Sequence, residues 1–263
     1  MLTLKKSLGQ NLLVDRNIIN KILNLYNIKN KNVLEIGPGT GNLTRFILEK
    51  NPKKLLLVEK DRRLCDILNS KLNDFKNLKV LNQDILNFNL NSGLKSEIIF
   101  GNLPYNISTQ ILAKIIKFDK LYPQIEKIIF MFQKEVAERI LAKPNNKNYS
   151  RITILANLKL DIDHSFKVSR ESFFPKPKID SKIVVFIPKK KIKYKIKNID
   201  NLEKITQIFF SRKRKMINKS FSKIFKNYEE VAKSLNIDLN KRPSELSCEN
   251  YYNITEKYEK IIG

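Results

Sequence analysis

The stretch NVLEIGPGTGNLT, residues 32–44, decides the fold. A short apolar run, NVLEI, leads directly into the glycines Gly37, Gly39 and Gly41. Glycines let the backbone turn tightly and approach a ligand without interference from a Cβ. The order GxGxG differs from the dinucleotide fingerprint GxGxxG, so the motif alone does not specify a pyrophosphate. It predicts a buried strand that ends in a ligand-binding loop.

Similar apolar runs alternate with helical patterns between residues 31 and 132. The runs that are typical of buried parallel strands are 32–36, 54–59, 78–82, 97–102 and 127–132. Apolar residues recur on one face in two candidate helices, 61–72 and 107–118. This alternation predicts an α/β fold with a Rossmann-like, doubly wound parallel sheet and right-handed crossovers.

The pattern changes in the second half of the chain. Residues 159–168 and 181–188 are predicted to be two strands separated by a proline-rich loop. The basic run KKKIKYKIKNID that follows is typical of a linker. From residue 201 onward the apolar period is helical again. We therefore expect two domains, a ligand-binding domain over 1–188 and a small C-terminal helical domain over 195–263.

Acidic residues end or follow the second and third predicted strands. Glu59 is the last residue of KLLLVE and stands 22 residues after Gly37. An acid at this place suits a ribose, whose two hydroxyls donate hydrogen bonds. Asp84 is placed to accept a hydrogen bond from an amino group such as that of adenine. Each acid alone is consistent with a solvated turn, but together with the glycines they indicate a site where open α/β sheets bind ligands.

This arrangement resembles the class I S-adenosylmethionine-dependent methyltransferases. In that class, the acid of the second strand holds the ribose and the acid after the third holds the adenine amino group. The resemblance implies S-adenosyl-L-methionine as the cofactor, with Glu59 and Asp84 among its ligands.

The fourth strand ends in NLPY, residues 102–105, a motif similar to that of methyltransferases acting on exocyclic amino nitrogens. An adenine N6 is a poor nucleophile because its lone pair is delocalised into the ring. The Asn102 side-chain oxygen and the Leu103 carbonyl would accept the N6 hydrogens and direct the lone pair toward a methyl donor. Pro104 keeps the turn rigid. Tyr105 offers a flat face on which a flipped base stacks.

Motifs along nearly the whole chain resemble the KsgA-type rRNA adenine N6-dimethyltransferases. In order, they are KKSLGQNLL, LEIGPGTGNLT, VEKD, NQDIL, FGNLPYNIS, FMFQKEVAERI, FFPKPKIDS and FFSRKRKMI. That family modifies two adjacent adenines in the 3′-terminal hairpin loop of 16S rRNA. The resemblance implies the same substrate, within the small ribosomal subunit or its precursor, a role in subunit biogenesis, and a monomer.

The resemblance also assigns site residues. It implies that the cofactor contacts are Asn11, Leu13, Gly37, Gly39, Glu59, Asp84 and Asn102. Phe173, from the pattern F-x-P-x-P-K, is expected to face Tyr105 across the target base. The implied catalytic residues are therefore Asn102, Leu103, Pro104, Tyr105 and Phe173. The chain departs from the family at Leu12, where Phe is frequent.

The charge is strongly positive, with 51 Lys and Arg against 26 Asp and Glu, a net charge of +25. Lysine-rich composition bias explains part of this excess, but not the shortage of acids. Nucleic acid is the expected partner of such a field. Arg212, Lys213, Arg214 and Lys215 are predicted to lie on a helix and to contact RNA phosphates. The alternative is a solvated helix face.

Other classes of site are not indicated. The two cysteines, Cys65 and Cys248, form no CxxC pair, so neither a zinc site nor a disulfide framework is expected, and no metal is implied. No apolar run reaches the roughly 18 residues of a membrane span. We therefore expect a cytoplasmic protein without a membrane partner.

Two other functions remain open. One is Erm-like methylation of a single adenine in 23S rRNA. Asp180, where Erm proteins tend to have Asn, and SLGQN in its present form both favour the small-subunit enzyme. The other is a non-catalytic nucleic-acid-binding assembly factor on the same fold. The intact NLPY motif, glycine loop, Glu59 and Asp84 argue against a non-catalytic factor.

Overall fold

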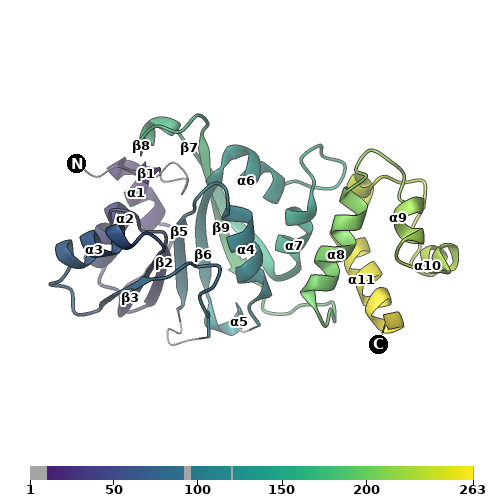
Figure 1. Cartoon of the computed structure of the whole chain (residues 1–263), viewed down its shortest axis with the longest axis horizontal. Coiled ribbons are helices and arrows are strands. Elements are labelled where there is room, and N and C mark those ends of the chain that lie inside the picture. Colours follow the sequence, from purple (N-terminus) through teal and green to yellow (C-terminus); the bar gives the residue numbers. More distant parts are fainter. Residues whose placement is uncertain (1–10, 92–95, 120, 263) are drawn as a thin grey trace. The chain divides into compact units, whose positions relative to one another are not determined.

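The computed structural model describes residues 11–91, 96–119 and 121–262 (Figure 1). By internal packing, the chain divides into two compact units. The first unit takes the chain up to residue 137 together with 161–188, and the second takes 138–160 together with the chain from 189 onward. This division differs from the boundary suggested by the sequence, because residues 138–160 group with the C-terminal helices.

The first unit alternates strands and helices in the predicted order. Its strands are β1 (Leu12–Leu13), β2 (Asn32–Ile36), β3 (Lys54–Glu59), β4 (Leu78–Asn82), β5 (Ile98–Asn102), β6 (Lys127–Gln133), β7 (Leu160–Val168), β8 (Phe173–Phe174) and β9 (Ser181–Pro188). Its helices are α1 (Arg16–Leu23), α2 (Asn42–Glu49), α3 (Arg62–Lys71), α4 (Ser108–Lys117), α5 (Leu121–Gln124), the start of α6 (Lys134–Ile140), and the 3-10 turn η2 (Arg170–Ser172). Each predicted strand and helix of this unit is present to within one residue at either end. The short strands β1 and β8 were not predicted.

Seven strands form the main sheet in the order β4-β3-β2-β5-β6-β9-β7. The five strands from β4 to β6 are parallel, and β9 runs antiparallel to β6. The chain leaves β2 for β3 on one side and returns to β5 on the other. The carboxyl ends of β2 and β5 therefore flank a topological switch point, where open α/β sheets bind ligands. The predicted doubly wound α/β architecture is confirmed.

The sheet is covered by helices on both faces, with α1, α2 and α3 on one side and α4 on the other (Figure 1). Side chains alternate between these faces along each strand. Val33, Leu55, Leu57 and Phe100 point to the same side and share one buried cluster with residues of α1, α2 and α3. The short apolar runs of the sequence are thus explained by burial on both faces.

The second unit is helical. Its elements are α7 (Arg151–Lys159), α8 (Ile199–Phe210), α9 (Asn218–Ser222), α10 (Tyr228–Ser234), the 3-10 turn η3 (Pro243–Glu245) and α11 (Cys248–Ile262). Helix α7 packs against both α8 and α11, and the Tyr252 hydroxyl of α11 donates to the Ile154 carbonyl at 2.8 Å. Six of the nine residues of α7 are buried. Because α7 is buried on most sides, its apolar residues do not recur with a clear 3.6-residue period. The sequence pattern therefore did not predict this helix.

The predicted linker forms neither helix nor strand over residues 189–198. It is nevertheless held against α11 of the same unit. The buried carboxylate of Glu259 accepts hydrogen bonds from the Lys197 and Asn198 amides at 2.7 and 2.9 Å. The basic run is therefore a packed connection within the second unit.

The helix predicted over Arg212–Lys215 is wrong. Helix α8 ends at Phe210 and α9 begins at Asn218, so the basic residues lie in the turn between them. The run SRKRK contains no apolar side chain that a helix face would bury, and the following Met216 is exposed. Without buried apolar contacts, adjacent like charges do not favour continuing the helix.

Among the residues that the structure describes, no helix combines the length and apolar character that a bilayer span needs. Across the same residues, no group of three or more His, Cys, Asp or Glu side chains is arranged to hold a metal ion.

Candidate active site

A cavity of about 210 Å³ opens at the carboxyl ends of the parallel strands in the first unit. This volume accommodates far more than a single water. Its lining comes from β1, the glycine loop after β2, the tip of β3, the loop after β4, and the NLPY turn after β5. All seven predicted cofactor contacts line it: Asn11, Leu13, Gly37, Gly39, Glu59, Asp84 and Asn102.

The glycine loop has the left-handed backbone that its composition predicts. Gly37 and Gly39 have φ values of 66° and 62°, a region that side chains with a Cβ rarely adopt. A Cβ on Gly39 would come within 2.7 Å of the Leu12 Cδ2. The loop therefore passes close under β1, and any side chain at residue 39 would collide with Leu12.

Glu59, at the tip of β3, is a buried carboxylate that organises this loop. Its Oε2 accepts from the Gly39 amide at 3.2 Å, and its Oε1 accepts from the Asp61 amide at 2.9 Å. Burial raises the pKa of Glu59, while these backbone hydrogen bonds oppose the rise. Each oxygen of a carboxylate has a second lone pair. Glu59 is thus positioned to accept the hydroxyl hydrogens of a ribose.

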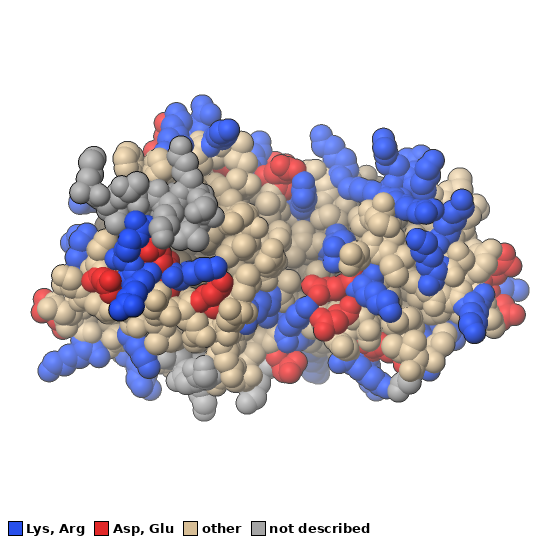
Figure 2. All heavy atoms as spheres, viewed as in Figure 1, with Lys and Arg blue, Asp and Glu red and all other residues tan. Residues whose placement is uncertain are grey.

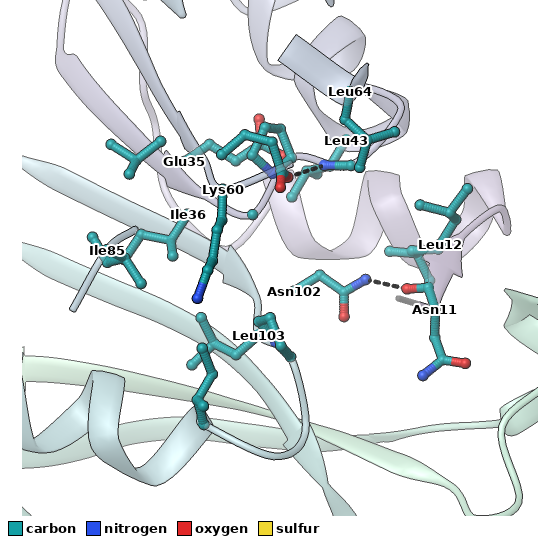
Figure 3. A pocket seen from close by; sticks show the side chains of 18 of the residues that line it. Asn11, Leu12, Glu35, Ile36, Leu43, Lys60, Leu64, Ile85, Asn102 and Leu103 are labelled. Atoms are coloured by element: carbon teal, nitrogen blue, oxygen red, sulfur yellow. Dashed lines mark hydrogen bonds between the residues drawn. The ribbon is translucent and has the colours of Figure 1, made fainter. Parts of the chain in front are cut away.

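Asp84, after β4, is paired with a lysine that the sequence analysis did not select. The Lys60 Nζ lies 2.8 Å from Asp84 Oδ2, and the Leu86 amide donates to Oδ1 at 2.9 Å. Figure 3 shows Lys60 extending from the tip of β3 into the cavity. The hydrogen bond from Lys60 lowers the pKa of Asp84. Asp84 therefore remains an anionic acceptor, as recognition of an amino group requires.

Glu35, in β2, is a second buried acid of the cavity that the sequence analysis missed. The Thr44 hydroxyl donates to its Oε2 at 2.7 Å. Desolvation raises the pKa of Glu35 to about 8, more than the Thr44 hydrogen bond lowers it. The sequence did contain a signal for Glu35, because it is an acid inside the apolar run NVLEI. Burying a carboxyl group there costs free energy unless the group is protonated or paired.

This pKa predicts a pH dependence of stability. Between pH 4.5 and about 8, the unfolded Glu35 carboxyl is ionised while the folded one keeps its proton. The folded state then binds more protons, so its free energy of unfolding falls as the pH rises through this range. Glu35→Gln keeps the acceptor for Thr44 but cannot ionise. Urea unfolding at several pH values should show the variant gaining stability over wild type as pH rises, whereas a constant difference would contradict the prediction.

The Asn102 side chain is held by Asn11, which lies 91 residues earlier in the chain. Its Nδ2 donates to the Asn11 carbonyl at 2.8 Å. Figure 3 shows the amide oxygen turned away from this bond. That oxygen makes no hydrogen bond with any residue in the described part of the chain. Because the nitrogen is anchored, the amide presents its oxygen to the cavity, and this oxygen is a hydrogen-bond acceptor.

The rest of the NLPY turn is held by packing and by one hydroxyl pair. The Leu103 side chain is buried and packs so closely on Gly101 that a Cβ there would come within 2.5 Å of its Cδ2. The Tyr105 hydroxyl lies 2.8 Å from the Ser181 Oγ of β9, and burial raises the pKa of Tyr105. Ser181 was missed because only the fold brings β9 beside this turn. Leu103, Pro104 and Tyr105 all line the cavity.

Phe173 is placed differently from the four NLPY residues. It is 4% exposed and belongs to the buried cluster that also contains Leu13 and Val168. It is not among the described residues that line the cavity, so its position opposite Tyr105 across a base stays a prediction. The neighbouring Phe174 is 67% exposed.

The basic turn of the second unit divides into two kinds of residue. Arg212, Arg214 and Lys215 are exposed. The Lys213 ammonium instead donates to the Lys147 and Tyr149 carbonyls at 2.6 and 2.9 Å. Lys213 therefore ties this turn to the segment before α7, and only the other three are free to meet a polyanion.

The donor and acceptor set of the cavity fits a nucleoside-containing cofactor. The fit rests on the close backbone at Gly37 and Gly39, on buried carboxylate oxygens at Glu59, and on the anionic Asp84. Beside them, Asn102 presents an amide oxygen to the same space. An amine that donates to this oxygen would lie next to the cofactor position, which is the arrangement that transfer of a group to an amino nitrogen requires.

Comparison with known proteins gives the family. A model of the family described as ribosomal RNA adenine dimethylase matches residues 1–260. The ribosomal RNA small subunit methyltransferase A of Pelagibacter ubique (strain HTCC1062) is 46% identical over 260 residues, which cover 98% of each chain. A solved dimethyladenosine transferase from Plasmodium falciparum superposes with a TM-score of 0.77 at 30% identity, covering 95% of this chain and 98% of that one.

A second solved structure shares the fold. It is the 23S rRNA methyltransferase ErmE, with a TM-score of 0.67 at 24% identity, covering 94% of this chain and 99% of that one. At this identity the likeness supports the α/β architecture alone. The family match over residues 1–260, joined to a cavity that presents the NLPY turn beside the glycine loop, places the chain in the ribosomal RNA adenine dimethylase family.

Proposed function

We propose that this chain transfers methyl groups to N6 of two adjacent adenines in the 3′-terminal hairpin loop of 16S rRNA. As a member of its family it is an S-adenosylmethionine-dependent rRNA adenine dimethyltransferase. We propose further that the substrate is the small ribosomal subunit or its precursor, and that the chain acts as a cytoplasmic monomer in subunit biogenesis.

The cofactor, S-adenosyl-L-methionine, supplies an electrophilic methyl group on a sulfonium when bound. Glu59 would accept hydrogen bonds from its ribose, and Asp84 from its adenine amino group. The Lys60 ammonium keeps Asp84 ionised. Gly37 and Gly39 let the loop backbone approach the cofactor, and β1 borders the same cavity through Asn11 and Leu13.

One observation carries the proposal: the Asn102 amide is anchored to the Asn11 carbonyl by its nitrogen. The free oxygen selects a donor, such as an exocyclic amino group, rather than an acceptor. With the Leu103 carbonyl as second acceptor, both N6 hydrogens would be held and the nitrogen lone pair directed at the methyl group. Tyr105, fixed by Ser181, would support the face of the flipped base.

The second unit supplies a surface suited to RNA phosphates. Three segments are tied together by hydrogen bonds from Lys213 to the Lys147 carbonyl, from Ile217 to the Lys241 carbonyl, and from Asn145 to the Ser244 carbonyl. They carry seven exposed cations, here called the basic patch: Lys143, Lys147, Arg212, Arg214, Lys215, Lys241 and Arg242. Figure 2 shows Lys and Arg side chains gathered on the visible face of this unit.

Replacing Arg212, Arg214 and Lys215 together with alanine should weaken binding to the small subunit and leave cofactor binding unchanged. Each lost phosphate contact should reduce the slope of log K against log salt by about 0.9 on a duplex or about 0.7 on a single strand. Lys213 is kept, because its loss would release the Lys147 and Tyr149 carbonyls.

The matched control removes three exposed lysines, Lys53, Lys54 and Lys76, which lie near the amino ends of β3 and β4. Filter binding across a salt series measures both variants. A control that flattens the slope as much as the patch variant would show that only net charge matters. An unchanged slope in the patch variant would remove this surface from the RNA path.

The assignment to the small subunit is supported by the relatives. The protein that is 46% identical over 98% of this chain carries the name ribosomal RNA small subunit methyltransferase A. The likeness to ErmE, at 24% identity, extends to the fold. The motifs of the chain point the same way, since Asp180 and SLGQN favour the small-subunit enzyme and the intact NLPY turn argues against a non-catalytic factor.

The experiment that tests the function compares purified 30S and 50S subunits that lack the modification, each incubated with labelled S-adenosylmethionine. Label should enter the 30S subunit and appear as N6,N6-dimethyladenosine at two adjacent positions after nuclease digestion and mass spectrometry. Label in the 50S subunit would establish the Erm-like alternative. Absence of label from both would establish the non-catalytic alternative.

A further inference from the structure

An apolar surface lies beside the cavity and has no role in the function described so far. Strands β1 and β8 form a separate two-stranded sheet, here called the β1–β8 ribbon. On and next to it, Phe174 and Val14 are exposed, by 67% and 47%. Large apolar side chains grouped on a surface indicate an interaction site. Folding does not account for them, because they are not buried in the core.

The register of the ribbon shows which way Phe174 faces. Leu13 pairs with Phe173 and Leu12 pairs with Phe174. Paired residues of an antiparallel ribbon lie on the same face. The pair Leu13–Phe173 is buried in the core. Leu12 and Leu13 both line the cavity, and the Leu12 Cδ2 lies over the glycine loop. Phe174 is therefore on the Leu12 face, one strand beyond the cavity lining.

Four cations lie close to this aromatic residue in sequence, and two of them are paired, Lys167 with Asp180 and Lys176 with Glu171. Residues 167–180 carry Lys167, Arg170, Lys176 and Lys178 against Glu171 and Asp180. Arg170 is fixed over the loop, since its amide donates to Asp180 Oδ1 at 3.0 Å and its Nη1 donates to the Lys178 carbonyl at 3.3 Å. Lys178 has an exposed side chain. Figure 2 shows Lys and Arg side chains gathered over the same end of the first unit.

We propose that Phe174 is a stacking platform for an unpaired RNA base next to the target adenine, with Arg170 and Lys178 contacting the adjoining phosphates. When the target base leaves its stack, its neighbour loses a stacking partner as well. An exposed aromatic ring flanked by cations offers the stacking and the phosphate contacts that single-stranded RNA requires. A second copy of this chain is a poor occupant, because each copy has a net charge of +25. The proposal rests on the proposed function.

The test uses an RNA hairpin loop with 2-aminopurine at the position next to the target adenine. At low salt, a chain of this charge binds RNA through phosphate contacts in any case. Stacking on Phe174 should change the 2-aminopurine fluorescence with wild type and with Phe174→Tyr. Phe174→Ala should lose this change and weaken RNA affinity by roughly 5- to 150-fold, the range that loss of one stacked base gives. Cofactor affinity should not change.

Phe75→Ala is the matched control, because Phe75 is an exposed phenylalanine of the same unit, 42% exposed, after α3. It should behave as wild type. The proposal is overturned if Phe174→Ala keeps the wild-type fluorescence change and affinity, or if Phe174→Tyr loses them as Phe174→Ala does. The function fails separately: if wild type methylates neither subunit while the signal still depends on Phe174, the platform stands and the proposed reaction does not.

Discussion

Asn102→Ala should lower the rate of methyl transfer by about 10²–10³-fold, which is the usual cost of removing one preorganised hydrogen-bonding group from an active site, about 2.7–4 kcal/mol in the barrier. The variant loses the acceptor that holds the amine and also the bond to the Asn11 carbonyl. It should still fold, because Asn102 is at the end of β5, is only partly buried, and lies outside the apolar core.

Single-turnover methylation of 30S subunits measures this effect without a contribution from product release, and thermal unfolding confirms that the variant is folded. Asn102→Asp provides a graded comparison, because it keeps an acceptor toward the cavity but places a second oxygen against the Asn11 carbonyl. It should fall between wild type and Asn102→Ala. Turnover of Asn102→Ala within tenfold of wild type would contradict the proposed role.

Glu59→Ala should weaken cofactor binding by roughly 10- to 150-fold, the range expected for a lost hydrogen bond to a charged group of about 1.5–3 kcal/mol. Two effects act in the same direction. The acceptor for the ribose disappears, and the Gly39 and Asp61 amides lose their partner, so the glycine loop is less well held. RNA affinity should be unchanged, because the basic patch lies in the second unit.

Isothermal titration with S-adenosylmethionine measures the cofactor affinity, and filter binding measures the RNA affinity. Asp66→Ala is the control, since Asp66 is an exposed acid of α3 that does not line the cavity. It removes the same charge and should bind the cofactor as wild type does. Equal affinities of Glu59→Ala and wild type would mean that Glu59 is a loop-organising acid with no contact to the ribose.

The sequence predicted the parts of the site that depend on local pattern. Short apolar runs marked the parallel strands, and four of the predicted cofactor contacts, Gly37, Glu59, Asp84 and Asn102, lie at or just after the end of one of them. Since parallel strands end at the same edge of a sheet, finding Gly37, Glu59, Asp84 and Asn102 at strand ends was enough to place them around one cavity. The family expected from the motifs is also confirmed.

The sequence did not reveal contacts between distant segments. The bond from Asn102 to the Asn11 carbonyl joins residues 91 positions apart, and the Tyr105–Ser181 pair joins residues 76 positions apart. Helix α7 was missed for a related reason, because its partners α8 and α11 bury most of its surface. The basic turn was predicted as a helix, although its run of charges has no apolar face that would hold a helix there.

The adjacent residues Phe173 and Phe174 show most clearly what the sequence determines and what only the tertiary structure decides. The sequence by itself determined that two aromatic residues stand at the start of a proline-rich loop, but it did not determine which of them is buried. Pairing with β1 decided this, because a shift of one residue in register exchanges the two faces of a strand. Local pattern specifies which residues form strands and loops, whereas the side chain that meets solvent depends on pairing with a segment some 160 residues away, which only the tertiary structure supplies.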